Sequence, residues 1–61
     1  MSNLDFLLNN TAFDLDYIIK MDGDNVVLGY FYGKDGSWVR YEYIFTEDGE
    51  FVTCNEVDRS N

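Results

Sequence analysis

KDGSW, residues 34–38, places an Asp-Gly pair and a tryptophan between two apolar stretches. Asp-Gly tolerates the positive φ of a tight hairpin turn, so this pair predicts a β-hairpin. The same dipeptide recurs in MDGD and EDGE, with its aspartates at positions 22, 35 and 48, two equal intervals (35 − 22 and 48 − 35) of 13. Three evenly spaced turns predict four strands of similar length.

The alternation of apolar residues with a period of two indicates which face of each strand is buried. If each Asp-Gly is a two-residue loop, all three hairpins place one common set of residues on an inner face. That set is Phe13, Leu15, Tyr17, Ile19, Val26, Leu28, Tyr30, Tyr32, Val39, Tyr41, Tyr43, Phe45, Val52 and Cys54. A slip of one residue would break this agreement, because it moves a whole strand's apolar set to the other face.

We therefore expect a mainly β (α+β) single domain over residues 1–61, built on a four-stranded antiparallel meander. The strands are expected at residues 12–21, 25–33, 38–46 and 51–58, with a tail at 59–61. A short helix over about 2–9 is the element available to cover the inner face. Ser2 and Asp5 have capping-box spacing at its start, and the apolar face of the helix is formed by Leu4, Leu7 and Leu8.

Two alternatives stay open at this point. Three-residue loops with a Gly bulge would shift the pairing of the strands. The stretch TAFDLDYIIKM, residues 11–21, also fits a helix, since Thr11 and Asp14 have capping-box spacing and Leu15, Ile18 and Ile19 fit one helical face.

The opposite face of the predicted sheet is also rich in apolar residues, which favours contact with another surface. Its members are Asp14, Asp16, Ile18, Lys20, Val27, Gly29, Phe31, Gly33, Trp38, Arg40, Glu42, Ile44, Phe51, Thr53, Asn55 and Val57. Trp38 is expected opposite Gly33. There it either covers the bare backbone or serves as an interface anchor.

The residue types argue against catalysis, so we expect a protein that is not an enzyme and uses no cofactor. The chain has no histidine and one cysteine, which leaves no triad base and no conventional zinc site. DGDN, residues 22–25, begins like a calcium loop, but Val26 and Val27 stand where an oxygen ligand and the turn glycine belong. Cys54 is expected to be a buried, inert thiol beside Tyr43.

Charge is the strongest functional signal in the sequence. Twelve acidic residues face four basic ones, for a net charge of −8 and a pI near 4.1. This balance disfavours direct binding to nucleic acid and to anionic membranes, and favours a basic protein partner, of which nucleic-acid-handling proteins are the richest source. The N-terminal residues MSNLDFLLNN do not resemble a signal peptide, so we expect a cytoplasmic protein, in the host cytoplasm if phage-encoded.

These features predict a small acidic inhibitor that masks a basic surface, comparable in type to phage-encoded antagonists such as anti-CRISPR or anti-restriction factors that mimic nucleic acid. In a meander the first and third turns emerge at one end, which gathers five acidic residues. The expected partner-binding residues are Asp22, Asp24, Glu47, Asp48, Glu50, Asp14, Asp16, Glu42, Trp38 and Phe31. The alternative is a structural subunit that forms a homodimer through the outer sheet face, because a chain of this size rarely has a strong core.

Overall fold

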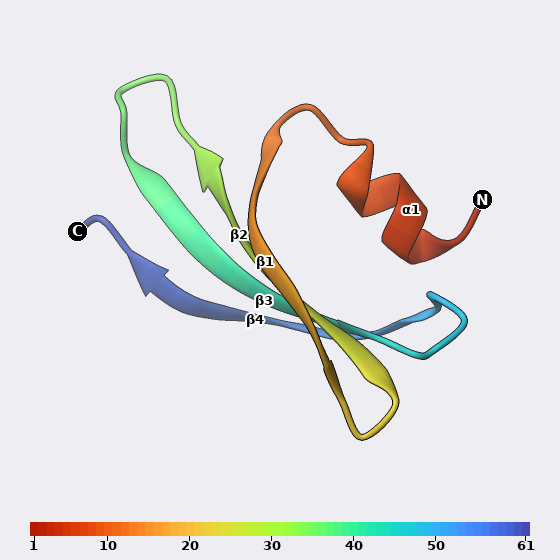
Figure 1. The fold of residues 1–61 in the computed structure, drawn as a ribbon. Helices are drawn as coiled ribbons and strands as arrows, with labels where there is room; N and C mark the ends of the chain where they lie inside the picture. The colour runs from red at the N-terminus through yellow and green to blue at the C-terminus, as the bar shows by residue number, and fades with distance from the viewer.

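The computed structural model describes residues 1–61 as one short helix followed by a single open sheet (Figure 1). Helix α1 (Asn3–Leu8) precedes strands β1 (Phe13–Met21), β2 (Asp24–Tyr32), β3 (Trp38–Phe45) and β4 (Phe51–Arg59). All neighbours are antiparallel and the strand order is β1-β2-β3-β4, which confirms the predicted meander. The helical alternative for residues 11–21 is wrong, because residues 11 and 12 form a turn and β1 occupies the rest of that segment.

Helix α1 begins as its capping box predicts. The Asp5 backbone N–H donates to Ser2 Oγ (3.1 Å), and the Ser2 N–H donates to the Asp5 carboxylate (3.4 Å). These two bonds satisfy backbone donors that the first helical turn leaves free. Leu7 is buried and Leu4 packs beside it, but Leu8 is 39% exposed, so the buried stripe of this six-residue helix is narrower than expected.

The first turn is the predicted two-residue loop. Met21 pairs with Asp24 across it, and both central residues have positive φ, 52° at Asp22 and 86° at Gly23. This is the backbone shape of a type I′ turn, which matches the twist of the flanking strands. An aspartate tolerates this conformation better than most residues do.

The second and third turns have one more loop residue than the first. This is the three-residue loop with a Gly bulge that the sequence analysis left as an alternative. In the second, the Gly33 N–H donates to the Ser37 carbonyl (2.8 Å), and only Gly36 has positive φ (85°). In the third, the Thr46 N–H donates to the Glu50 carbonyl (2.8 Å), and Gly49 has φ of 86°. Each therefore has three residues in its loop, with the aspartate before the glycine at negative φ.

The wider second turn shifts the register between β2 and β3 by one residue. Val27 pairs with Tyr43 and Tyr30 with Arg40, whereas two-residue loops predicted Leu28 opposite Tyr43. The predicted inner face is therefore wrong for β2, whose side chains all point the other way relative to β3. The expected Trp38–Gly33 pair is also wrong, since Trp38 lies opposite Tyr32.

Bulges adjust the register of both outer strands. The shift at the third turn pairs Phe45 with Phe51, and a bulge at residue 52 then restores the predicted Tyr43–Cys54 pair. In β1, residues 17–19 pair as predicted, but a bulge at residue 16 aligns Leu15 with Gly29. A bulge inserts one unpaired residue and so reverses the facing of everything beyond it.

The sheet consequently has a helix face and an outer face that differ from the predicted ones. From the registers, the helix face carries Phe13, Leu15, Ile18, Lys20, Asn25, Val27, Gly29, Phe31, Val39, Tyr41, Tyr43, Phe45, Phe51, Cys54, Glu56 and Arg59. The outer face carries Asp14, Tyr17, Ile19, Met21, Asp24, Val26, Leu28, Tyr30, Tyr32, Trp38, Arg40, Glu42, Ile44, Thr53, Asn55 and Asp58.

A small aromatic core joins helix and sheet. Its buried members are Leu7, Phe13, Val27 and Phe45, with Leu4, Phe31 and Tyr43 packed against them. The Phe13 ring lies within 5.3 Å of Phe31 and 5.8 Å of Tyr43, centroid to centroid. The same ring covers Gly29, where an added Cβ would collide with it. An aromatic over a bare glycine therefore exists here, but Phe13 supplies it rather than Trp38.

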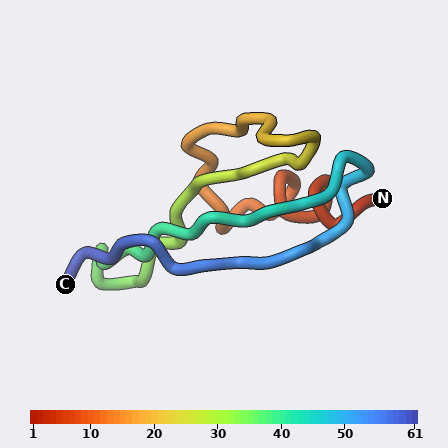
Figure 2. Tube along the Cα trace, turned by 90° about the horizontal axis from the view of Figure 1, so that it is seen from below, coloured from red at the N-terminus to blue at the C-terminus, as the bar shows by residue number.

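The twisted sheet has two distinct ends (Figures 1 and 2). The β1–β2 turn, the β3–β4 turn and helix α1 lie at one end, while the β2–β3 turn and the C-terminus lie at the other. Helix and third turn are joined by hydrogen bonds from the Leu4 N–H to the Gly49 carbonyl (2.9 Å) and from the Phe51 N–H to Asn3 Oδ1 (2.8 Å). The first residues of the chain therefore brace the third turn.

Gly49→Ala should destabilise the protein more than Gly36→Ala. Both glycines have φ near +85°, where a side chain costs about 1–2 kcal/mol. A Cβ at position 36 meets open space, whereas at Gly49 it would lie 2.6 Å from Ser2 Oγ and displace the helix start. Urea unfolding of both variants measures the difference. Equal losses would contradict the bracing role of this contact.

Candidate protein-binding surfaces

The acidic end is the group of carboxylates on the first and third turns: Asp22, Asp24, Glu47, Asp48 and Glu50. Both turns lie at the same end of the sheet (Figures 1 and 2). Four of these residues are exposed and Asp24 is half-buried. None of the five is in an ion pair, so their charge is available to another molecule.

Local hydrogen bonds hold the acidic turns in defined shapes. In the third turn the Glu50 N–H donates to Thr46 Oγ1 (3.1 Å), and the Gly49 N–H donates to the Thr46 carbonyl (2.9 Å). The buried Asn25 donates from Nδ2 to the Thr46 carbonyl (3.1 Å), which ties the start of β2 to the third turn. The carboxylates therefore stand on loops whose backbone is already ordered before a partner arrives.

Aromatic side chains form a second surface on the outer face. Tyr30 stands between Tyr32, stacked at 6.1 Å, and Trp38, edge-on at 5.4 Å. The Arg40 guanidinium lies 5.5 Å from the Tyr30 ring centroid, within the range of a cation–π contact. Trp38 is half-buried in this aromatic group rather than projecting freely.

Of the three predicted site acids on β1 and β3, two lie beside the aromatic group. Asp16, at the β1 bulge, accepts a hydrogen bond from Arg40 (2.9 Å) in an ion pair. Asp14 accepts from the Tyr32 hydroxyl (3.1 Å), and the pKa of Tyr32 is raised, first by partial desolvation and then by this carboxylate. Glu42 lies apart, between Leu28 and Asn55. The outer-face acids are thus partly engaged within the protein.

Phe31 does not belong to the outer face. The shifted register turns it to the helix face, where it packs against Phe13 and edge-on against Tyr41 at 5.8 Å. Its expected place beside Trp38 is therefore wrong. The cause is the three-residue second loop, because a one-residue change in register reverses the facing of every residue in β2.

An apolar hollow beside the helix was not foreseen from the sequence. It has a volume of about 250 Å³ and is lined by Asn3, Phe6, Leu7, Asn10, Tyr43, Phe45 and Phe51. Phe6 is 70% exposed and Phe51 is 52% exposed. The sequence signal for this hollow is Phe6, an aromatic residue that lies outside the apolar helix face formed by Leu4, Leu7 and Leu8.

Tyr43 lies at this hollow and pairs with Cys54 across the β3–β4 ladder. Burial raises the pKa of Tyr43 to about 12, and the neighbouring Cys54 thiol adds to the rise. The expected Tyr43–Cys54 neighbours are thus confirmed, although Cys54 is half-buried rather than fully enclosed. A phenol that stays protonated serves here as a packing group.

No cluster of three or more His, Cys, Asp or Glu side chains is arranged to hold a metal ion. No helix is long and apolar enough to cross a membrane. Comparison with protein-family models, curated proteins and solved structures finds no match to this chain.

Trp38→Ala should lower the free energy of unfolding by about 1–3 kcal/mol, because it removes a half-buried ring and its edge-on contact with Tyr30. Tyr32→Ala is the control, since Tyr32 is 56% exposed and should cost less. Urea unfolding followed by circular dichroism compares the two. Unchanged stability in Trp38→Ala would rule out a packing role for the indole.

Alkaline pH should weaken the fold through Tyr43. Its pKa is raised in the folded state to about 12, so the unfolded chain loses this proton first as the pH climbs above about 10. Stability is therefore fully present below pH 10 and falls as the pH rises toward 12. Tyr43→Phe should remove this part of the loss in urea unfolding between those values. Tyr17→Phe, at an exposed tyrosine, should leave it in place.

Proposed function

We propose that this protein binds and masks a basic surface on another protein, and that the acidic end makes the contact. The partner class is a protein that itself handles nucleic acid, since such proteins present dense Lys and Arg patches. The mode of action is steric and electrostatic. An inhibitor of restriction or CRISPR machinery, acting as a nucleic-acid mimic, is the type of activity that fits.

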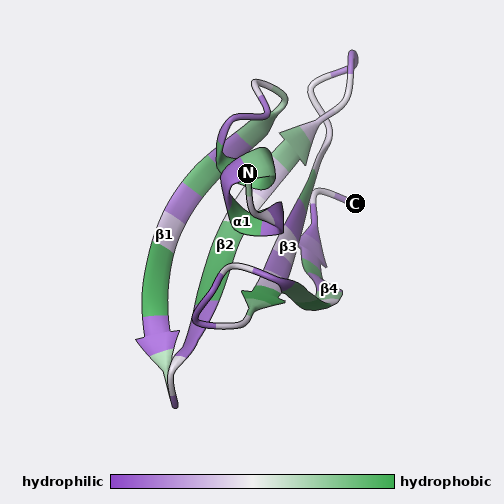
Figure 3. Ribbon diagram, turned by 90° about the vertical axis from the view of Figure 1, so that its right-hand side faces the viewer, coloured by the Kyte–Doolittle hydropathy of each residue, from purple (hydrophilic) through white to green (hydrophobic).

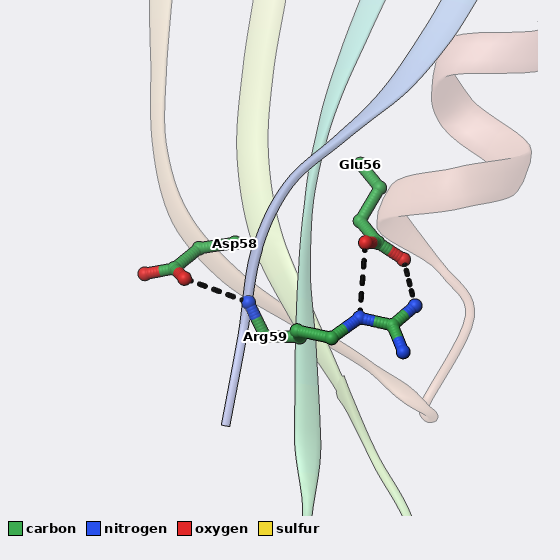
Figure 4. Close-up of polar contacts among 3 residues, drawn as sticks. All are labelled: Glu56, Asp58 and Arg59. Atoms are coloured by element: carbon green, nitrogen blue, oxygen red, sulfur yellow. Dashed lines mark hydrogen bonds and ion pairs between the residues drawn. The ribbon is translucent and has the colours of Figure 1, made fainter. Parts of the chain in front are cut away.

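This proposal is supported by the pairing of the arginines with carboxylates of the same chain. Both arginines are occupied. Arg40 pairs with Asp16, and Arg59 pairs with Glu56, as Figure 4 shows. Hydrogen bonding to the Arg59 guanidinium also lowers the pKa of Glu56. Of twelve acids, two are paired, so ten carboxylates (12 − 2) have no ion-pair partner within the chain.

Unpaired carboxylates at the turns favour a basic partner for two physical reasons. The summed negative field steers a positively charged protein toward the surface and speeds association. Ordered loops also present their charges without first losing conformational freedom, which lowers the cost of binding. Nucleic acid is disfavoured as a direct ligand, because phosphates would meet the same negative field.

Self-association through the outer face is a second candidate, favoured by one observation. The outer face has no covering element, and it exposes Tyr17 (43%), Ile19 (42%) and Met21 (54%). Only eight of 61 residues are buried, so a second copy would add apolar burial that the monomer lacks. Sedimentation at increasing protein concentration tests this, and a monomer at all concentrations would rule it out.

Neutralising two carboxylates of the acidic end should weaken partner capture. Asp22→Asn with Asp48→Asn removes two charges from the first and third turns, and Asn suits the positive φ at position 22. Immobilised protein is exposed to host lysate, and captured proteins are quantified by mass spectrometry. We expect a basic, nucleic-acid-binding partner whose recovery falls about tenfold with this variant and falls as salt is raised.

The matched control is Asp35→Asn with Asp58→Asn. It removes the same charge from the second turn and the end of β4, which lie at the opposite end of the sheet (Figure 1). Asn at position 35 keeps the oxygen that accepts from Ser37. Equal losses in both variants would mean that only net charge matters. Recovery of no basic protein would refute the proposed function.

A further inference from the structure

We propose that the free edge of β1 accepts an extended, basic segment of the partner protein as an additional strand. This inference rests on the proposed function, because it names how the basic partner is held. It concerns a surface that adjoins the acidic end at Asp22 and Asp24. β1 is one margin of the sheet, with β2 as its only strand neighbour (Figure 3).

The backbone of β1 offers hydrogen-bonding groups at this margin. Met21 and Asp24 close the two-residue first turn, and such a closing pair exchanges hydrogen bonds. Along an antiparallel edge strand, the backbone N–H and C=O groups of successive residues point alternately toward the neighbouring strand and toward solvent. The backbone groups of Ile19 therefore point toward β2, and those of Ile18 and Lys20 point away from it. Their N–H and C=O groups have no strand beside them, which is the template that an added strand uses.

Side chains on both faces of β1 are left open. Tyr17 and Ile19 on the outer face are 43% and 42% exposed, and Ile18 on the helix face is 38% exposed. An adjacent strand with alternating apolar residues would cover both sets at once. Covering only one face, as a second sheet would, leaves the other set in water.

The other margin of the sheet, formed by β4, is protected against the addition of a strand. β1 is therefore the more suitable edge. β4 carries two register shifts, which leave Val52 and Val57 without cross-strand partners. Bulges of this kind interrupt the regular edge and oppose strand addition. Residues 17–21 of β1 pair with β2 without interruption and hold a single charge, that of Lys20.

Charge decides which strand fits. Asp14 precedes this open segment and Asp22 and Asp24 follow it, so Lys or Arg side chains on the added strand meet carboxylates at both ends. A second copy of β1 meets repulsion instead. Antiparallel self-pairing centred on Ile19 sets Asp22 of one copy opposite Asp16 of the other. Pairing centred on Ile18 sets Asp22 opposite Asp14, and Lys20 opposite Asp16 only offsets that repulsion. A basic segment is therefore the favoured occupant.

The test uses a synthetic peptide of about nine alternating Val and Lys residues, a typical strand length, with a Val and Glu peptide as its acidic twin. Amide hydrogen exchange is followed by NMR. We expect the basic peptide to slow exchange at Ile18 and Lys20 by about tenfold or more, and the acidic peptide to leave it unchanged. Amides along β4 should not respond to either peptide.

Two proline variants test the backbone contact. Ile18→Pro removes an outward N–H, so it should weaken binding of the basic peptide by about tenfold, the equivalent of one lost hydrogen bond. Val57→Pro is the control, since it replaces another exposed β-branched residue at a bulge of the opposite margin. Circular dichroism of both variants verifies that the sheet remains folded. If Ile18→Pro unfolds the chain, backbone N-methylation of Ile18 in a synthetic protein replaces it.

The outcomes separate this inference from the proposed function. Binding of the basic peptide that perturbs only residues 22–24 and 47–50 would overturn the edge site and leave the acidic end intact. Protection of Ile18 that grows with protein concentration alone would overturn it in favour of a second copy. Edge protection by the basic peptide, together with unchanged partner capture by Asp22→Asn with Asp48→Asn, would support the edge site while counting against the acidic end.

Discussion

The positive φ at Gly36 is the constraint on which the arrangement of the sheet depends. With the left-handed residue confined to Gly36, the second loop takes three residues, and β2 and β3 align in the observed register. That register brings Val27 beneath the helix and places Phe31 against Phe13. It also sends Tyr30 to the outer face, where Trp38 and Arg40 gather around it. One backbone angle thus divides the aromatic residues between the core and the exposed face.

The charged side chains differ in whether they have a partner within the chain. The two arginines bind carboxylates of their own chain, one across the outer face and one within β4. The turns hold acids that no base neutralises. Folding therefore sorts the carboxylates into two groups, one that fixes the sheet and one that projects from its end. The proposed binding function uses the second group, and the open margin of β1 offers apolar and backbone contacts beside it.

The sequence predicted the elements better than it predicted their faces. Asp-Gly pairs, period-two patterning and the Ser2–Asp5 capping box are local signals, and each predicted its turn, strand or helix correctly. The face on which a strand's side chains lie depends on the length of the preceding loop. An Asp-Gly pair is compatible with both the two-residue loop at Asp22 and the three-residue loop at Asp35. Bulges at residues 16, 52 and 57 have no local signature either, since packing and cross-strand contacts select them. The location of the acidic turn residues could be predicted from the meander, because it depends only on where the turns are. The location of Phe31 and Trp38 could not be predicted in this way, because it depends on the register between strands.

The bond between Leu4 and the Gly49 carbonyl has a consequence for the order of folding. Contacts between sequential strands close short loops and form quickly, while this one joins residues far apart in the sequence and costs a larger loop-closure entropy. On the ribosome, helix α1 is made before β4 and has no docking site until residues 49–51 have emerged. An isolated six-residue helix is unstable in water, so the N-terminal segment stays unstructured during synthesis. Helix α1 precedes the sheet in the chain and is therefore the last of these elements to become ordered.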